Sequence, residues 1–151
     1  MGLISWMFVE KTVDEKTISS VENTFGVRFP SDYRECVQKY NGGYPKPNKF
    51  DFDNGTQGVF NDLISFTDEV LNIQMFFDFK DDPCTMGIVP FGRDPFGNLL
   101  CFDFRNSLDK PQIVFYDHEE KIEDAITPIC SSFTELLERM YSLEENKDNG
   151  G

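Results

Sequence analysis

Three short apolar runs in the second half of the chain are joined by short connections. The runs cover residues 87–91, 99–104 and 113–116, and each has the length and composition of a β-strand. Parallel neighbours need a crossover of a dozen or more residues, and these connections are shorter than that. The first connection ends in Gly97 and Asn98, which tolerate positive φ. The pattern therefore predicts an antiparallel sheet that begins with a β-hairpin.

Helical periodicity precedes these runs. Ile18, Val21 and Phe25 fall on one face of a helix predicted over residues 14–25, and Gly26 stands where a left-handed stop is needed. The next break, at a Phe-Pro pair, is followed by a second helical stretch.

Two more helices are expected before the sheet. Ser31 is the predicted N-cap of the second helix, which ends at residues 41–43. Thr67 or Asp68 begins a third helix that runs to about Phe79. The apolar residues of this third helix spread around much of its circumference, so we expect it to be well buried.

The last helix has the clearest start signal. Ser132 and Glu135 fit a capping box, in which serine and glutamate satisfy backbone donors reciprocally. An apolar stripe then continues to about Tyr141. The remaining predicted pieces are a first strand or packed arm at 4–9, a loop at 44–58 around an extended stretch at 49–52, and strands at 59–66 and 121–126.

Helices first, strands in succession and then one helix predict an α+β fold, an antiparallel β-sheet with flanking helices. The length of 151 residues fits a single domain. We place that domain at residues 1–143 and expect a flexible acidic tail at 144–151. Sixteen Phe residues lie mostly inside periodic segments, so they are predicted to form the core.

The charge balance restricts the partners. The sequence has 27 acidic and 14 basic residues, for a net charge of −13. Nucleic acids and anionic lipids bind through basic patches, so this charge disfavours both. It favours encounter with a basic protein, although acidity also simply keeps a domain soluble.

Residue patterns for catalysis or metal binding are weak. The single histidine, His118, has no serine or cysteine in a nucleophile elbow to serve. Residues 51–62 resemble a calcium loop but place Thr56 where such loops require glycine. The four cysteines form no CxxC pair and are expected to be reduced, partly buried thiols. We therefore predict no catalytic residue, no metal site and no cofactor.

Targeting signals are also weak. Residues 1–9 are apolar but lack a basic n-region and a small-residue cleavage site. No apolar run approaches the length of a membrane helix. These features predict a cytoplasmic protein.

Four stretches of the sequence, taken together and in order, span about residues 14–141. The stretches are Ile18 to Tyr33 with Phe25-Gly26-Val27 and Phe29-Pro30-Ser31-Asp32-Tyr33, then Tyr40-Asn41-Gly42-Gly43, then Ile88-Val89-Pro90-Phe91-Gly92 continuing through Asp94, Gly97-Asn98 and Cys101-Phe102-Asp103, and last Val114 to Glu119 followed by Ser132-Phe133-Thr134-Glu135-Leu136-Leu137. With these motifs the sequence resembles the SUKH superfamily, which includes yeast cell-wall assembly regulators of the Smi-one/Knr-four type and many bacterial immunity proteins.

This resemblance implies a non-enzymatic α+β domain and, in bacteria, an immunity protein that binds a cognate toxin. Nucleases tend to present basic clefts to phosphate, so an acidic inhibitor has complementary charge. The partner predicted here is therefore a basic protein toxin, with a nuclease as one candidate. Six residues are the predicted contacts: Tyr44, Asp94, Phe96, Asp117, Glu119 and Glu120.

Two alternatives stay open at the level of sequence. One is a regulatory scaffold like the eukaryotic members, although those carry long disordered flanks and this sequence has almost none. The other is a small metal-dependent hydrolase that uses the acidic clusters. Packing against the sheet is the ordinary alternative role for Tyr44 and Phe96.

Overall fold

The largest sheet is antiparallel throughout. A computed structural model describes residues 2–3 and 5–142, so the predicted tail at 144–151 lies outside the described residues. The sheet has the strand order β5-β6-β7-β8-β9. Its strands are β5 (Asp62–Leu63), β6 (Ile88–Arg93), β7 (Leu99–Asp103), β8 (Gln112–Tyr116) and β9 (Ile126–Cys130). The predicted α+β class and the hairpin between β6 and β7 are confirmed.

Two small antiparallel sheets stand beside the large one. The N-terminal segment pairs as β1 (Ser5–Met7) with β2 (Tyr44–Lys46), and β3 (Lys49–Asp51) pairs with β4 (Gln57–Val59). The predicted extended stretch at 49–52 is thus confirmed. The prediction of a loop for the rest of 44–58 was wrong, because it contains β2 and part of β4.

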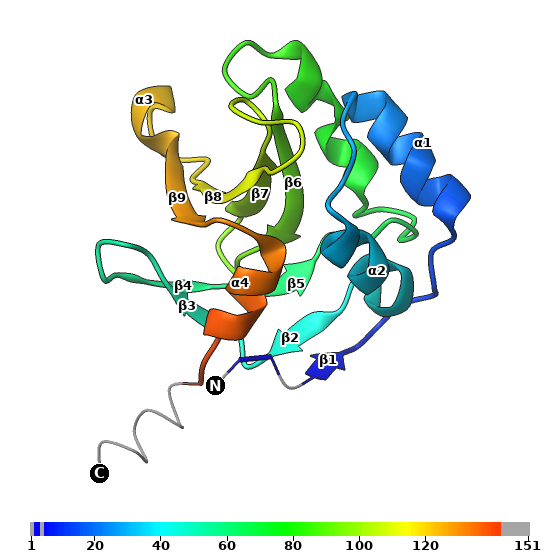
Figure 1. Cartoon of the computed structure of the whole chain (residues 1–151), viewed down its shortest axis with the longest axis horizontal. Helices are drawn as coiled ribbons and strands as arrows, with labels where there is room; N and C mark the ends of the chain where they lie inside the picture. The colour runs from blue at the N-terminus through cyan, green and yellow to red at the C-terminus, as the bar shows by residue number, and fades with distance from the viewer. Residues whose placement is uncertain (1, 4, 143–151) are drawn as a thin grey trace.

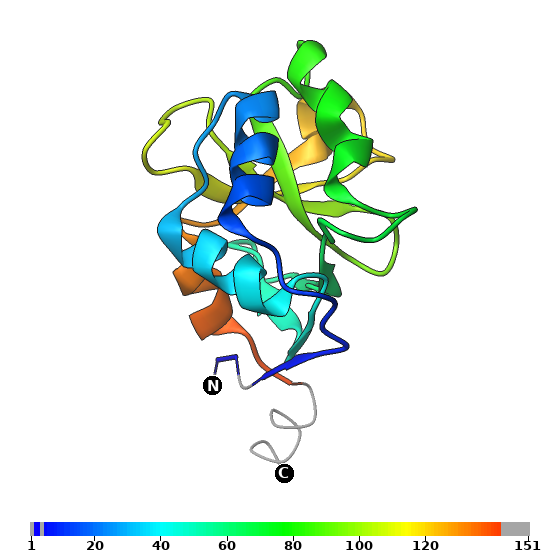
Figure 2. The ribbon, with the colours of Figure 1, turned by 90° about the vertical axis from the view of Figure 1, so that its right-hand side faces the viewer.

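Helices lie on both faces of the large sheet. They are α1 (Glu15–Phe25), α2 (Ser31–Tyr40), the 3₁₀ helix η1 (Ile73–Asp81), the single turn α3 (Ile122–Ala125) and α4 (Phe133–Arg139). Figures 1 and 2 show this arrangement, and in Figure 2 the sheet stands between α2 and α4 on the left and η1 on the right.

Helix ends follow the predicted cap chemistry in most places. The Asp14 carboxylate accepts a hydrogen bond from Thr17 N (2.9 Å), and Gly26 has φ 73° at the end of α1. The Ser132 hydroxyl accepts from Glu135 N (3.1 Å), whereas the Glu135 carboxylate accepts from Ser131 N rather than Ser132 N. The capping box is therefore shifted by one residue on one side.

The predicted Ser31 cap was wrong. Pro30 occupies the N-cap position without a side-chain bond, and Ser31 is the first helical residue. The Asp32 carboxylate instead accepts from Tyr33 N (2.8 Å) and from Thr134 N (3.0 Å) of α4. This carboxylate therefore ties the starts of α2 and α4 together.

The predicted third helix was also wrong. Residues 67–72 form a non-helical turn, and only Ile73–Asp81 is helical, with 3₁₀ geometry. Asn72 caps η1 by accepting from Gln74 N (2.9 Å). Ile73 is buried, but Val70, Leu71 and Met75 are 76%, 49% and 53% exposed, so the expected burial on all sides does not occur.

The predicted strand over 121–126 was misplaced. Residues Ile122–Ala125 form a helical turn, and the strand follows as β9 (Ile126–Cys130). The expected strand over 59–66 is likewise reduced to the end of β4 and the two residues of β5. Around β5, Phe60, Ile64 and Phe66 are nevertheless buried on irregular backbone.

The core is aromatic and centres on Tyr33 of α2. Its ring lies 5.0 Å from Phe102 on β7, 5.8 Å from Phe91 on β6 and 5.5 Å from Phe133 on α4, centroid to centroid. On the other face, Phe79 of η1 contacts Tyr116 of β8 at 5.6 Å. The prediction that phenylalanines form the core is confirmed by eight buried residues: Phe29, Phe50, Phe60, Phe66, Phe91, Phe102, Phe104 and Phe133.

The cysteines are free thiols in differing environments. Cys101 is buried, Cys36 and Cys130 are partly buried, and Cys84 is exposed. Burial was therefore wrongly expected for Cys84. Among the described residues, no helix combines the length and apolar character needed to cross a bilayer.

Candidate protein-binding surface

A buried ion pair joins β5 to β6 at the edge of the large sheet. Arg93, the last residue of β6, pairs in register with Asp62 of β5. Arg93 Nε donates to Asp62 Oδ1 (3.3 Å) and Nη2 donates to Oδ2, while Asn61 Nδ2 donates to Oδ1 (3.0 Å). The Asp62 side chain is 3% exposed and that of Arg93 is 34% exposed. The guanidinium thus compensates a buried carboxylate while one side of it faces solvent.

Nearby groups affect the electrostatic potential at Arg93 and so the pKa of its guanidinium. The hydrogen bond to Asp62 raises the pKa of the Arg93 guanidinium, and partial burial opposes that rise. Tyr44 on β2 and the Asp68 carboxylate also raise the pKa. Tyr44 and Asp68 therefore contribute to the electrostatic potential at Arg93 from two other segments of the chain.

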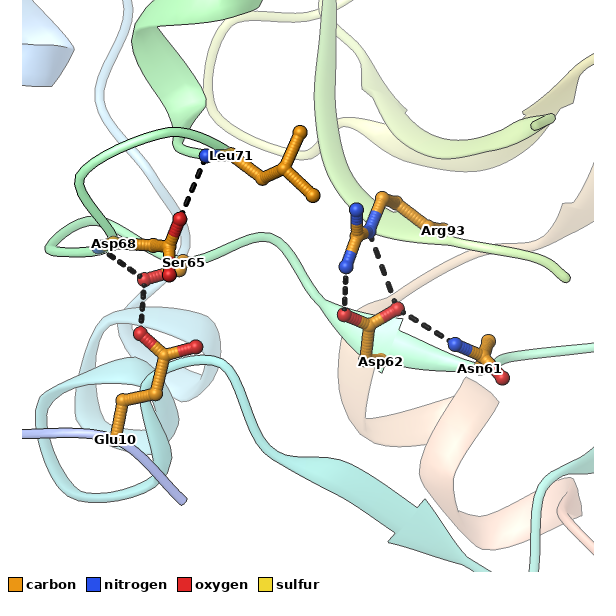
Figure 3. Close-up of polar contacts among 7 residues, drawn as sticks. All are labelled: Glu10, Asn61, Asp62, Ser65, Asp68, Leu71 and Arg93. Carbon is orange, nitrogen blue, oxygen red and sulfur yellow. Dashed lines mark hydrogen bonds and ion pairs between the residues drawn. The ribbon is translucent and has the colours of Figure 1, made fainter. Parts of the chain in front are cut away.

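The turn at residues 65–72 is held by a chain of hydrogen bonds, drawn in Figure 3. Ser65 Oγ donates to Glu10 Oε1 (2.7 Å) and accepts from Asp68 N (2.9 Å). The Asp68 carboxylate in turn accepts from Val70 N (3.0 Å) and Leu71 N (2.7 Å). These backbone bonds lower the pKa of Asp68, so the carboxylate stays ionised and the turn keeps its shape at neutral pH.

Asn41 anchors the same turn from the protein interior. Its side chain is fully buried, with Oδ1 accepting from Phe66 N (2.8 Å) and Nδ2 donating to Thr67 Oγ1 (2.8 Å) and Lys11 O (3.1 Å). The residue that ends α2 thereby fixes the start of the turn.

An apolar cavity opens between this turn and the β6–β7 hairpin. Its volume is about 230 Å³. Figure 3 shows the Leu71 side chain extending toward Arg93. The residues lining the cavity come from both sides: Ile64, Leu71, Asn72, Met75 and Phe76 from the turn and η1, and Arg93, Gly97, Asn98 and Leu99 from the hairpin.

The hairpin turn owes its shape to Asp94. Its Oδ1 accepts from Phe96 N and Asn98 N, both at 2.8 Å, and its Oδ2 accepts from Asn98 Nδ2 (3.0 Å). Asp94 is only 9% exposed, whereas Phe96 is 76% exposed. Of the two predicted contact residues in this turn, Phe96 is presented to solvent and Asp94 serves the turn itself.

The loop after β8 lies against the hairpin. His118 N donates to Asn98 Oδ1 (3.2 Å), and His118 Nε2 lies 3.2 Å from Phe96 O. Asp117 accepts from Glu119 N (3.0 Å), which closes the acidic turn. The structure thus brings the predicted contacts Phe96, Asp117, Glu119 and Glu120 to one side, with Glu119 and Glu120 exposed.

Tyr44 begins β2 beside the β5 edge of the large sheet, since the O atom of the preceding Gly43 accepts a hydrogen bond from Leu63 N of β5 (2.9 Å). It is 36% exposed and its ring meets Phe8 edge-on, with centroids 5.6 Å apart. Phe8 has φ 55° and is 73% exposed. The Phe8–Tyr44 pair is therefore exposed to solvent beside β2. We call the surface formed by Tyr44, Leu71, Met75, Arg93 and Phe96 the Arg93 face.

The Arg93 face includes residues that the sequence did not indicate. Tyr44 and Phe96 were predicted contacts, but Leu71, Met75 and Arg93 were missed. One signal pointed toward them: the stretch around residues 70–77 has more apolar side chains than one short helix can bury. Within the described part of the chain, no group of three or more His, Cys, Asp or Glu side chains is placed to hold a metal ion.

A family model described as SMI1-KNR4 cell-wall, SUKH_6, matches residues 15–137. The chain belongs to this SUKH family. The match covers α1 through most of α4 and so includes every residue of the Arg93 face. The resemblance deduced from the sequence motifs is thereby confirmed.

A relative of this SUKH chain is the SPbeta prophage-derived uncharacterized protein YokK of Bacillus subtilis (strain 168). The two are 25% identical over 162 residues, covering 89% of this chain and 79% of the relative. SUKH membership supports an immunity-type or related domain that works through protein partners, in a family that is generally non-enzymatic.

Proposed function

We propose that this SUKH chain is an immunity protein that binds a cognate protein toxin and neutralises it by direct contact. The observation that carries the proposal is the Arg93 face, where large apolar side chains are exposed on hydrogen-bonded turns. Met, aromatic residues and Arg are enriched at protein interfaces. Exposed apolar patches rimmed by polar residues typically mark such interfaces.

The charge of the chain supports a basic toxin. A net charge of −13 attracts a positively charged surface and speeds the encounter. Glu119 and Glu120 are exposed in the loop that contacts the hairpin turn carrying Phe96 through His118. Nucleases have basic clefts for phosphate, and carboxylates placed next to an aromatic anchor match such a cleft. A cytoplasmic nuclease toxin is therefore the proposed partner class.

Co-expression in bacteria tests the proposal. Cells that produce the toxin encoded beside this gene are expected to grow when they also produce this chain and to stop growing without it. The double variant Glu119→Lys, Glu120→Lys should weaken this protection. The matched control Asp109→Lys, Glu138→Lys makes the same change in net charge at exposed positions away from the Arg93 face. Growth arrest despite folded wild-type protein contradicts the proposal.

The family description favours one second candidate, a regulatory scaffold related to cell-wall assembly. A scaffold binds several partners and protects against no toxin. If several unrelated proteins co-purify with this chain, and the chain does not restore growth to cells that produce the toxin, the scaffold is supported over the immunity function.

A further inference from the structure

We propose that the cavity beside Arg93 receives one large apolar side chain of the partner, carried on a segment with Lys or Arg on both sides of it. This inference rests on the proposed function for the identity of the partner, and on the cavity itself for the chemistry. It specifies where the toxin inserts an anchoring side chain and which residues flank that side chain in the toxin sequence.

The cavity has the size and lining for such a side chain. An apolar cavity of about 150 Å³ holds a benzene molecule, and this one measures about 230 Å³. Its walls are mainly aliphatic and aromatic, with Ile64, Phe76 and Leu99 behind Leu71 and Met75. Met75 is flexible and polarisable, so it adapts to either a phenyl or an isobutyl group.

The charges around the cavity select the flanking residues. Asp68 and Glu69 stand on the turn side, and Asp117, Glu119 and Glu120 stand beyond the hairpin. The positive charge of Arg93 is already matched by Asp62, and Lys121 follows Glu120 in the loop. A basic segment therefore gains complementary charge, whereas a second copy of this chain, with its own charge of −13, is repelled.

The cavity wall is organised before the partner arrives. Leu71 is half-exposed, yet its backbone N–H is held by Asp68, which is held by Ser65, which is held by Glu10. Binding therefore orders little additional backbone, and preorganisation of this kind raises affinity.

A titration of the ¹⁵N-labelled full chain with synthetic peptides tests the inference. The probe is acetyl-Lys-Lys-Phe-Lys-Lys-amide, and the expected result is saturable shifts of the backbone amides of Leu71, Met75, Gly97 and Asn98. One control peptide replaces Phe by Gly, and the other replaces every Lys by Glu. Each control peptide should bind with an affinity at least about tenfold lower than that of the probe. Equal binding of either control peptide, or shifts on another face, overturns the inference.

Variants separate the cavity from general surface effects. Leu71→Asp should weaken peptide binding by about tenfold because it puts a carboxylate at the cavity wall. Leu108→Asp is the matched control, since Leu108 is 68% exposed in the loop at the other end of β7. Both variants are checked for an unchanged circular dichroism spectrum, and a Leu71 variant that misfolds is replaced by Met75→Asp. Equal binding by a folded cavity variant and the wild type overturns the inference.

The two proposals fail in different ways. If the wild type protects cells and Leu71→Asp protects them equally well, the immunity function holds and the cavity is not the anchor site. If the peptide binds at the cavity as expected but the wild type gives no protection, the recognition chemistry holds and the immunity function does not.

Discussion

Tyr33 places a polar hydroxyl inside the apolar core. It is fully buried among Phe29, Phe91, Phe102 and Phe133, and its hydroxyl has no hydrogen-bond partner among the described residues. Burial raises the pKa of this hydroxyl well above its usual value. The ring stabilises the fold by packing, while the buried hydroxyl opposes it.

Replacing Tyr33 by Phe is therefore expected to stabilise the protein. Removing a buried, unpaired hydroxyl without changing the ring should raise the free energy of unfolding by about 1 kcal/mol. Urea denaturation at neutral pH measures the change, with Tyr40→Phe, at a partly exposed ring on the same helix, as the control near zero. A clear loss of stability in Tyr33→Phe means that the hydroxyl is bonded in solution.

Helix ends were predictable from sequence where the hydrogen bonds that form them join residues close together in the chain. Asp14 and Gly26 mark the ends of α1 because their bonds reach only three or four residues along the chain. The same reasoning failed at Ser31 because Pro30, one residue earlier, takes the cap position. Pro30 has no capping side chain, so the start of α2 lies one residue before the position that the side-chain pattern predicts.

At the scale of elements, the 65–72 turn shows why pattern and structure diverged. Its apolar residues fit a helix, but the Asp68 carboxylate takes the N–H groups of Val70 and Leu71 and so competes with helical hydrogen bonding. The β1–β2 pairing was equally hidden, since it joins segments about forty residues apart and depends on no local signal.

Asn41 is expected to be the main support of this turn. In Asn41→Ala the buried Phe66 N–H loses its partner, so the free energy of unfolding should fall by about 2 kcal/mol. Amide exchange in residues 65–72 should accelerate more than exchange in β7. Asn23→Ala, at an exposed position of α1, is the control. Uniform acceleration across the sheet would show that Asn41 supports the whole fold rather than this turn.

At the scale of the whole molecule, buried thiols couple stability to alkaline pH. Burial, with Asp32 nearby, raises the pKa of Cys36 to about 12, and burial raises that of Cys130 to about 11. In the unfolded chain both thiols titrate near 9.0. The unfolded state therefore loses protons first, and stability that is present below pH 9 declines as the pH rises toward these folded-state values.

The expected slope is about 1.4 kcal/mol per pH unit for each thiol between pH 9.5 and 10.5. Urea denaturation across this range measures it, under reducing conditions. The double variant Cys36→Ala, Cys130→Ala lowers stability at every pH but should reduce the slope, to which the buried Cys101 thiol still contributes. An equally steep decline in the variant would assign the alkaline sensitivity to other groups, such as Tyr141, whose pKa is raised to about 12.

The fold class and the family were accessible from sequence, but the position of the proposed binding surface was not. Turn spacing at residues 92–98 predicted the hairpin, and the motif order indicated the family. The Arg93 face assembles from β2, the 65–72 turn, η1 and the hairpin, so its members share no local pattern. Asp94 illustrates the limit, because a polar residue in a turn resembles a contact residue until its three hydrogen bonds are seen.

The central claim is that the Arg93 face binds a protein toxin, and amide hydrogen exchange tests it most directly. The full chain is compared alone and with saturating amounts of the toxin against which it protects cells. We expect slower exchange concentrated in residues 66–75 and 93–98, with little change in α2 and α4. Unchanged exchange throughout the chain, or protection confined to the α2 and α4 side, would contradict the account.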